Sequence, residues 1–212
     1  MSVQGEIKRV QEVVANPSAL GLLGLAMVTL VASSQKLGIT GGDTHSVALV
    51  LPWAIFLGAI AQLVAGLYDF KHNNTFGATA FCGYGLFWCG VAMTWMINMG
   101  MFGANAAAAA DINQLGFAFL GYFIFTLYMT VGAMSTHKVL FTIFVLIDLL
   151  FLGLFMNTLG LGGEFWHKLA AWSELGIAIC SFYASAASVL NTHCGTVVLP
   201  VGKPFGPWAP KS

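Results

Sequence analysis

Charged side chains are scarce in this sequence. Only 8% of its 212 residues are Asp, Glu, Lys or Arg, whereas 58% are hydrophobic. A water-soluble domain of this size carries far more charge on its surface, so the composition excludes an ordinary soluble protein. The eight basic residues form no patch of the kind that binds nucleic acid, and no nucleic-acid partner is expected.

Cysteine pairs and metal-binding clusters are also lacking. The four cysteines form no C-x-x-C pair, and three of them fall inside long apolar segments, which is unlike a disulfide framework or a zinc site. His, Asp and Glu show no metal-ligand spacing, and no Ser–His–Asp set can be argued. We therefore expect no metal and no cofactor, and we do not expect an enzyme.

The sequence contains several long apolar runs. Crossing the hydrocarbon core of a membrane requires roughly 20 residues, and six segments qualify, approximately 19–35, 47–68, 75–98, 114–135, 139–159 and 168–191. The loops between them are short. The sequence therefore predicts an all-α membrane protein with six transmembrane helices. A cleaved signal peptide is the competing interpretation of the first run, but its leader is long and partly acidic.

The basic residues indicate how the chain sits in the membrane. With the N-terminus inside, the cytoplasmic side carries Lys8, Arg9, Lys71, Lys138, Lys203 and Lys211, and the outer side carries Lys36 and Lys168. This imbalance predicts that both termini are cytoplasmic. Apolar residues at helical spacing predict a short amphipathic helix over 1–15. The expected division is thus 1–15, a six-helix transmembrane domain over 16–202, and a cytoplasmic tail over 203–212.

The segment Asn16-Pro17-Ser18-Ala19-Leu20-Gly21-Leu22 marks the start of the first apolar run. Asn16 suits the N-cap and Pro17 the first helical position. We expect the next backbone N–H groups to lack intrahelical partners, and such a helix end binds anions without Lys or Arg. An ordinary helix cap at the membrane surface is the alternative.

A second polar feature lies within the apolar runs. Ala54, Gly58, Gln62 and Gly66 recur every four residues, so they share one helix face with a single amide among small residues. This face either packs against another helix or lines a narrow, weakly polar path. The last run has a similar face with Ser181, Ser185 and Ser188.

Other polar residues are placed at definite depths in these runs. Tyr84 lies between Gly83 and Gly85, too deep for an interfacial aromatic belt, so we expect its ring in a lumen. Asp148 is near the middle of its run, as either a proton site or a neutral acid that donates one hydrogen bond. Glu174 is close enough to an end to reach the outer interface. The histidines all lie near the ends of the runs, and a pH-sensing role is not favoured.

Several stretches together resemble the acetate uptake transporters, also called succinate–acetate permeases. The family's hallmark is Asn-Pro-Ala-Pro-Leu-Gly-Leu, and this chain reads NPSALGL, with Ala19 in place of the second proline. Further similarity lies in GAIAQLVAGLYDFKHNNTFGATAFCGYGLFW, FTLYMTVGAMSTHKVL and VLNTHCGTVVLPVG, so that it covers most of the chain from Asn16 to Gly202.

The resemblance implies a homo-hexamer in the plasma membrane, with one pore in each subunit. Members pass acetate, and some pass succinate, by channel-like or proton-coupled transport. For such a transporter we expect the substrate-binding or pore-lining residues to be Asn16, Pro17, Leu20, Gly21, Gln62, Tyr84 and Asn191. The family's Phe, Tyr and Leu constriction falls on Leu25, Tyr84 and Ile147. The family is not known to require an acid at Asp148, so a proton-coupling role there concerns this chain alone.

Two mechanisms remain open on the sequence. An anion could be held by Tyr84, Gln62 and the N–H groups after Pro17. A neutral acid could cross instead, with Asp148 as the proton donor, although only about one molecule in 500 is protonated at pH 7. Rival functions are a channel for another small solute, such as formate or ammonia, and a non-transporting membrane sensor. A water channel of the familiar kind needs two NPA half-helices, and the sequence has one Asn-Pro box.

Overall fold

The computed structural model describes residues 14–42 and 46–207, and these residues form helices without a strand. The elements are α1 (Ser18–Lys36), α2 (Leu51–Trp53), the π-helix η2 (Ala54–Ala61), α3 (Gln62–Lys71), α4 (Thr75–Asn98), α5 (Ala104–Ala109), α6 (Ile112–Ala133), α7 (Lys138–Thr158) and α8 (Glu164–Cys194). With α2, η2 and α3 counted as one continuous helix, six helices are long and apolar enough to cross a membrane. The predicted all-α fold with six spans is confirmed.

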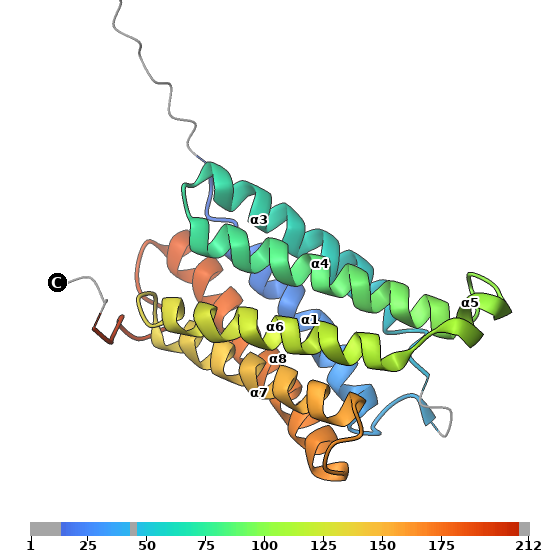
Figure 1. Cartoon of the computed structure of the whole chain (residues 1–212). Helices are drawn as coiled ribbons and strands as arrows, with labels where there is room; N and C mark the ends of the chain where they lie inside the picture. Colours follow the sequence, from blue (N-terminus) through green and yellow to red (C-terminus); the bar gives the residue numbers. More distant parts are fainter. Residues whose placement is uncertain (1–13, 43–45, 208–212) are drawn as a thin grey trace, which may run out of the picture.

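The six long helices run side by side as a bundle, and short α5 projects from one end (Figure 1). At the end opposite α5, three helices begin (α1, α4 and α7) and three finish (α3, α6 and α8). We call this end the Asn16 end, and we call the end that carries α5 the Lys36 end. The described chain both starts and finishes at the Asn16 end, where the Phe205 N–H bonds the Met134 carbonyl. The predicted helix over 1–15 lies outside the described residues, except that 14 and 15 are not helical.

Several helices have a side-chain cap at their N-terminus. The Asn74 Oδ1 accepts a hydrogen bond from the Gly77 N–H at 3.0 Å, and Asp111 does the same for Asn113 at 2.9 Å. At the start of α7 the acceptor is the ring nitrogen Nδ1 of His137, 3.1 Å from the Leu140 nitrogen. These bonds satisfy N–H groups that have no partner in the preceding turn.

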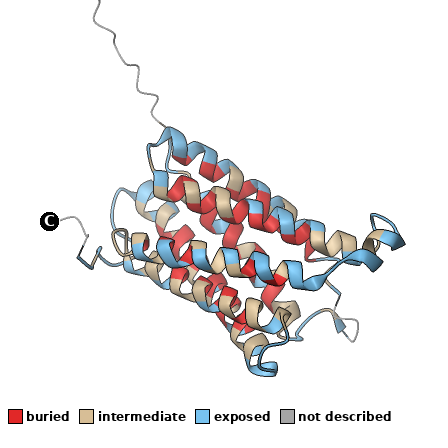
Figure 2. Ribbon diagram, in the orientation of Figure 1, coloured by how far each residue is buried: buried red, intermediate tan, exposed pale blue. Residues whose placement is uncertain are grey.

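Burial separates the two faces of each helix (Figure 2). The predicted small-residue face is confirmed as a packed face, because Ala54, Gly58, Gln62 and Gly66 are all buried. α6 is covered least, and it exposes large apolar side chains that include Phe117, Ile124, Leu127 and Val131. Such a surface suits contact with lipid.

Two features of the fold differ from the sequence prediction. The second span contains the π-helix η2 and begins at Leu51, not at residue 47, because 47–50 form a turn. Pro52 lies in the first turn of the helix, where its missing N–H is tolerated. Glu174, which the sequence placed close enough to an end to reach the outer interface, is buried. Its side chain is 2% exposed and lies 2.8 Å from the Lys36 Nζ, which joins α1 to α8 at the Lys36 end. A buried acid next to a basic partner avoids the penalty of an isolated charge.

Gly66 is a site where close packing can be tested. A methyl group there would stand 2.8 Å from the Cys82 nitrogen and 3.1 Å from the Ala78 carbonyl oxygen, and neither backbone atom can move aside easily. We expect Gly66→Ala to lower the free energy of unfolding by about 1–3 kcal/mol. Thermal unfolding in detergent measures this change. Gly90→Ala is the matched control, since nothing lies within 4 Å of that position; a Gly66→Ala variant as stable as Gly90→Ala would contradict the packing described.

Candidate functional site

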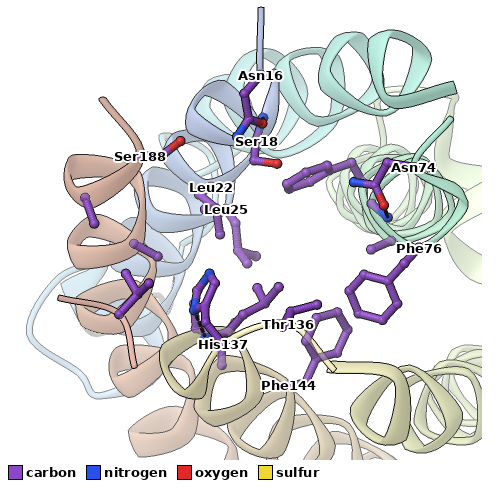
Figure 3. A pocket seen from close by; sticks show the side chains of 18 of the residues that line it. Asn16, Ser18, Leu22, Leu25, Asn74, Phe76, Thr136, His137, Phe144 and Ser188 are labelled. Atoms are coloured by element: carbon purple, nitrogen blue, oxygen red, sulfur yellow. Dashed lines mark hydrogen bonds between the residues drawn. The ribbon is translucent and has the colours of Figure 1, made fainter. Parts of the chain in front are cut away.

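A cavity of about 380 Å³ opens at the Asn16 end of the bundle. Its walls come from α1, α3, α4, α7 and α8, together with Val201 from the segment after α8. Figure 3 shows side chains from several of these elements pointing toward one central space. Residues far apart in the sequence therefore share one concave site of the kind that holds small molecules.

The cavity gathers most of the residues expected to line a pore. Asn16, Leu25, Gln62, Tyr84, Ile147 and Asn191 all line it. Pro17, Leu20, Gly21 and Asp148 are not among its lining residues. Leu20 is 41% exposed and faces away from the bundle core.

Leu25, Tyr84 and Ile147 form a buried apolar set at the deep end. They are 7%, 4% and 3% exposed and lie on α1, α4 and α7. The Tyr84 ring stacks on Phe151 and lies 5.3 Å from the Phe125 ring centroid. This aromatic packing holds Tyr84 in place. All three members of the expected constriction therefore line the same cavity, and the constriction itself stays a prediction.

The Tyr84 hydroxyl already has a partner. Its oxygen is 2.9 Å from the Thr126 Oγ1, and Thr126 donates its own proton to the Tyr122 carbonyl at 2.8 Å. Thr126 has a single proton, so Tyr84 must be the donor in the first bond. The sequence-based expectation that Tyr84 donates to a passing carboxylate thus requires that a hydrogen bond first be broken.

Gln62 lines the cavity and carries a buried acceptor without a partner among the described residues. Its Nε2 donates to the Gly58 carbonyl at 2.8 Å, and since a carbonyl oxygen can only accept, the amide orientation is fixed. The Oε1 atom has no hydrogen-bond partner among the described residues, although the side chain is fully buried. A buried polar atom without a partner is rare and marks a place where a ligand atom can bind.

The start of α1 offers fewer donors than expected. The prediction of Asn16 as N-cap and Pro17 as the first helical residue is wrong by one position, because α1 begins at Ser18 with Pro17 at the N-cap. The Asn16 Oδ1 accepts from the Ser18 N–H at 2.9 Å in the turn before the helix. The Leu20 and Gly21 N–H groups bond the Pro17 carbonyl at 3.0 and 3.2 Å. Among the described residues, the Ala19 N–H is the one left without an acceptor in this turn. The expectation of several free N–H groups is therefore wrong, because the tight first turn uses them.

Asn191 binds the backbone of the segment that follows α8. Its Oδ1 accepts from the Val198 and Leu199 N–H groups at 2.7 and 2.9 Å, and its Nδ2 donates to the Leu199 carbonyl at 2.9 Å. Three of its four hydrogen-bonding positions are therefore used. Asn191 holds the segment after α8 against the cavity mouth, and one amide proton is left for a solute.

Asp148 faces α6 and not the cavity. Its Oδ2 accepts from the Thr130 hydroxyl at 2.7 Å, and its Oδ1 has no partner among the described residues. It follows Ile147 in α7, but unlike Ile147 it is not among the residues that line the cavity. Asp148 as a proton site stays a prediction.

His137 lines the cavity and was not expected there. The sequence placed it in a turn, and only its position just before α7 could have indicated a cap. Burial lowers the pKa of its ring below the ordinary value, because burial disfavours the charged form. No Lys, Arg, Asp or Glu is found among the described residues that line the cavity, so its polar groups are neutral amides and hydroxyls and this imidazole.

Comparisons with known proteins identify relatives of this chain. The model of the GPR1/FUN34/yaaH family matches residues 2–203. The chain is 35% identical over 191 residues to the succinate-acetate/proton symporter SatP of Escherichia coli (strain K12), covering 89% of this chain and 96% of that protein. It is 29% identical over 208 residues to acetate permease A of Emericella nidulans, covering 92% of this chain and 68% of that protein. A solved structure of the bacterial acetate channel SatP matches with a TM-score of 0.80 and 32% identity, covering 90% of this chain and 100% of that one.

We predict that His137 makes the free energy of unfolding depend on pH. Its Nδ1 accepts the Leu140 N–H, so protonation of Nδ1 removes the cap. Because the folded pKa is lowered, the unfolded chain binds more protons, and the free energy of unfolding decreases as pH falls below about 6.5.

We expect this decrease to be absent in His137→Asn, since asparagine caps helices without titrating. Thermal unfolding of both proteins between about pH 7 and about pH 5 measures the difference. Parallel pH profiles for the two proteins would contradict the assignment.

Proposed function

Because the chain belongs to the GPR1/FUN34/yaaH family, we propose that this multi-pass integral membrane protein transports acetate and similarly small carboxylates. The solute enters the cavity at the Asn16 end and passes the constriction of Leu25, Tyr84 and Ile147. The family consists of transporters and channels, and we infer no catalytic step. The neutral lining supports the proposal, since a site without a cation binds a small anion weakly and releases it.

We further propose that the solute crosses the constriction as the neutral acid. The observation that carries this proposal is the unpartnered Gln62 Oε1, which can accept the O–H of a carboxylic acid but repels a carboxylate oxygen. The Tyr84 proton is held by Thr126 and is not free to compensate an anion. The deep end is thus complementary to an acid that still carries its proton.

The free-energy cost of protonating the solute is compatible with passage as the neutral acid. Protonating a carboxylate with a pKa near 4.3 at pH 7 costs about 4 kcal/mol. Moving the ionised form into an apolar constriction costs several kcal/mol for the single charge, with no cation present to offset it. Protonation therefore costs no more than desolvating the charge, and the Gln62 oxygen then gains a hydrogen bond.

The orientation and assembly are proposed on separate grounds. In the described part of the chain, Lys71, Lys138 and Lys203 lie at the Asn16 end, and Lys36 and Lys168 lie at the other. This distribution supports a cytoplasmic Asn16 end in a plasma membrane. A homo-hexamer, implied by the resemblance, remains a prediction, as does the cytoplasmic tail over 203–212.

Uptake of labelled acetate into proteoliposomes tests the proposed function. We expect protein-dependent uptake that increases as the external pH falls, approaching tenfold per unit above the pKa of the acid. Gln62→Met keeps the length of the side chain and removes the acceptor, so protein-dependent uptake should fall by about tenfold or more. Protein-free vesicles measure the acetic acid that crosses lipid unaided.

Ser181→Ala is the matched control for Gln62→Met. The Ser181 hydroxyl is also buried and unpartnered among the described residues, but it does not line the cavity. Its loss should leave uptake unchanged. Uptake that is the same in Gln62→Met as in the parent protein would contradict passage as the neutral acid, and no protein-dependent uptake at any pH would contradict acetate transport. Formate and ammonia gradients in the same vesicles test the rival solutes.

A further inference from the structure

His137 combines two hydrogen-bonding roles on one ring. Its Nδ1 accepts the Leu140 N–H at 3.1 Å, and no described residue hydrogen-bonds its Nε2. The ring lines the cavity, and Figure 3 shows it pointing into the central space from the start of α7. One nitrogen therefore holds the helix start while the other is available to a solute.

The cap fixes which nitrogen carries the proton. A neutral imidazole has one N–H and one bare nitrogen, and the N–H of Leu140 requires the bare nitrogen at Nδ1. The ring proton must then be on Nε2. His137 thus presents a fixed N–H donor to the cavity without carrying a positive charge.

Three other polar residues of the lining, Asn74, Thr136 and Asn191, are more fully used. The Asn74 Oδ1 accepts from Gly77 while its Nδ2 donates to Asp69 at 3.2 Å. The Thr136 hydroxyl donates to the Ala133 carbonyl at 2.7 Å. Asn191 keeps a single free amide proton. His137 therefore provides an imidazole N–H donor on the α7 side of the cavity. Asn16 and Ser18 lie across the cavity, on the α1 side (Figure 3).

The geometry points to His137 as a binding residue for the carboxylate anion at the cavity mouth, with its Nε2–H donating to a carboxylate oxygen before the solute reaches the constriction. This inference rests on the proposed function. The ionised form is the abundant one at neutral pH, and a mouth with donors collects it. The deep end, with the Gln62 acceptor, takes the protonated form. Mouth and deep end thus select different states of one solute.

Replacements at His137 separate binding from capping. Asparagine and serine retain a cap acceptor but are too short to place a donor in the cavity, whereas alanine removes both functions. We expect the acetate concentration for half-maximal uptake to rise by about tenfold in His137→Asn and His137→Ser, because a hydrogen bond to a charged group is lost, with the maximal rate little changed. Asp111→Asn changes an exposed cap outside the cavity, at the start of α6, and should behave as the parent protein.

Nitrogen-15 NMR of the full-length protein at about pH 7.5 gives a readout that does not need transport. The His137 signal, identified by its loss in His137→Asn, should show the proton on Nε2. Sodium acetate should shift the Nε2 resonance more than sodium chloride does. A proton on Nδ1, or no shift with acetate, would overturn the inference.

The outcomes distinguish this inference from the proposed function. If the parent protein takes up acetate and His137→Asn has the same half-maximal concentration, the role of His137 is wrong and the transport function stands. If the parent protein takes up no acetate in any condition while the Nε2 resonance still responds to acetate, the transport function is wrong and the binding role stands.

Discussion

The hydrogen bond from the Gln62 amide nitrogen to the Gly58 carbonyl determines what the deep end of the cavity can offer a solute. In an apolar bundle each polar group must find a partner within the protein, and Gln62 satisfies its donor within its own helix. Its carbonyl oxygen is left buried and unpartnered. The Tyr84 hydroxyl, in the same cavity lining, donates its proton to Thr126, which in turn donates to the Tyr122 carbonyl. The deep end therefore lacks a free donor from these two residues and has one free acceptor.

The rest of the cavity is consistent with this polarity. Its mouth has neutral donors, of which His137 has the most clearly fixed geometry, and its lining lacks charged side chains among the described residues. A carboxylate can be collected at such a mouth and protonated from the solution. A neutral acid can then pass the apolar set of Leu25, Tyr84 and Ile147. The buried Lys36–Glu174 pair is at the other end of α1 and α8, and it stabilises their contact away from this cavity.

The sequence predicted which helices form and some of the positions that line the cavity, such as Gln62 and Tyr84, because apolar length and four-residue spacing are local signals. The six spans, the packed face of Gln62 and the depth of Tyr84 follow from such signals. The hydrogen-bond partners could not be predicted, because they depend on other helices or on backbone detail. Examples are Thr126 beside Tyr84, the backbone of 198–199 on Asn191, and Lys36 on Glu174. The role of His137 was missed because nothing local shows that its ring turns into a cavity.

Passage of the neutral acid makes one electrical prediction that anion passage does not share. Proteoliposomes loaded with potassium and treated with valinomycin allow a membrane potential to be imposed while the acetate and pH gradients are held fixed. If the solute crosses as the neutral acid, the initial rate of labelled acetate uptake is the same at every imposed potential, and uptake carries no net charge. A rate that follows the potential, with an inside-positive potential accelerating uptake, would contradict the account and show that the acetate anion itself crosses the constriction.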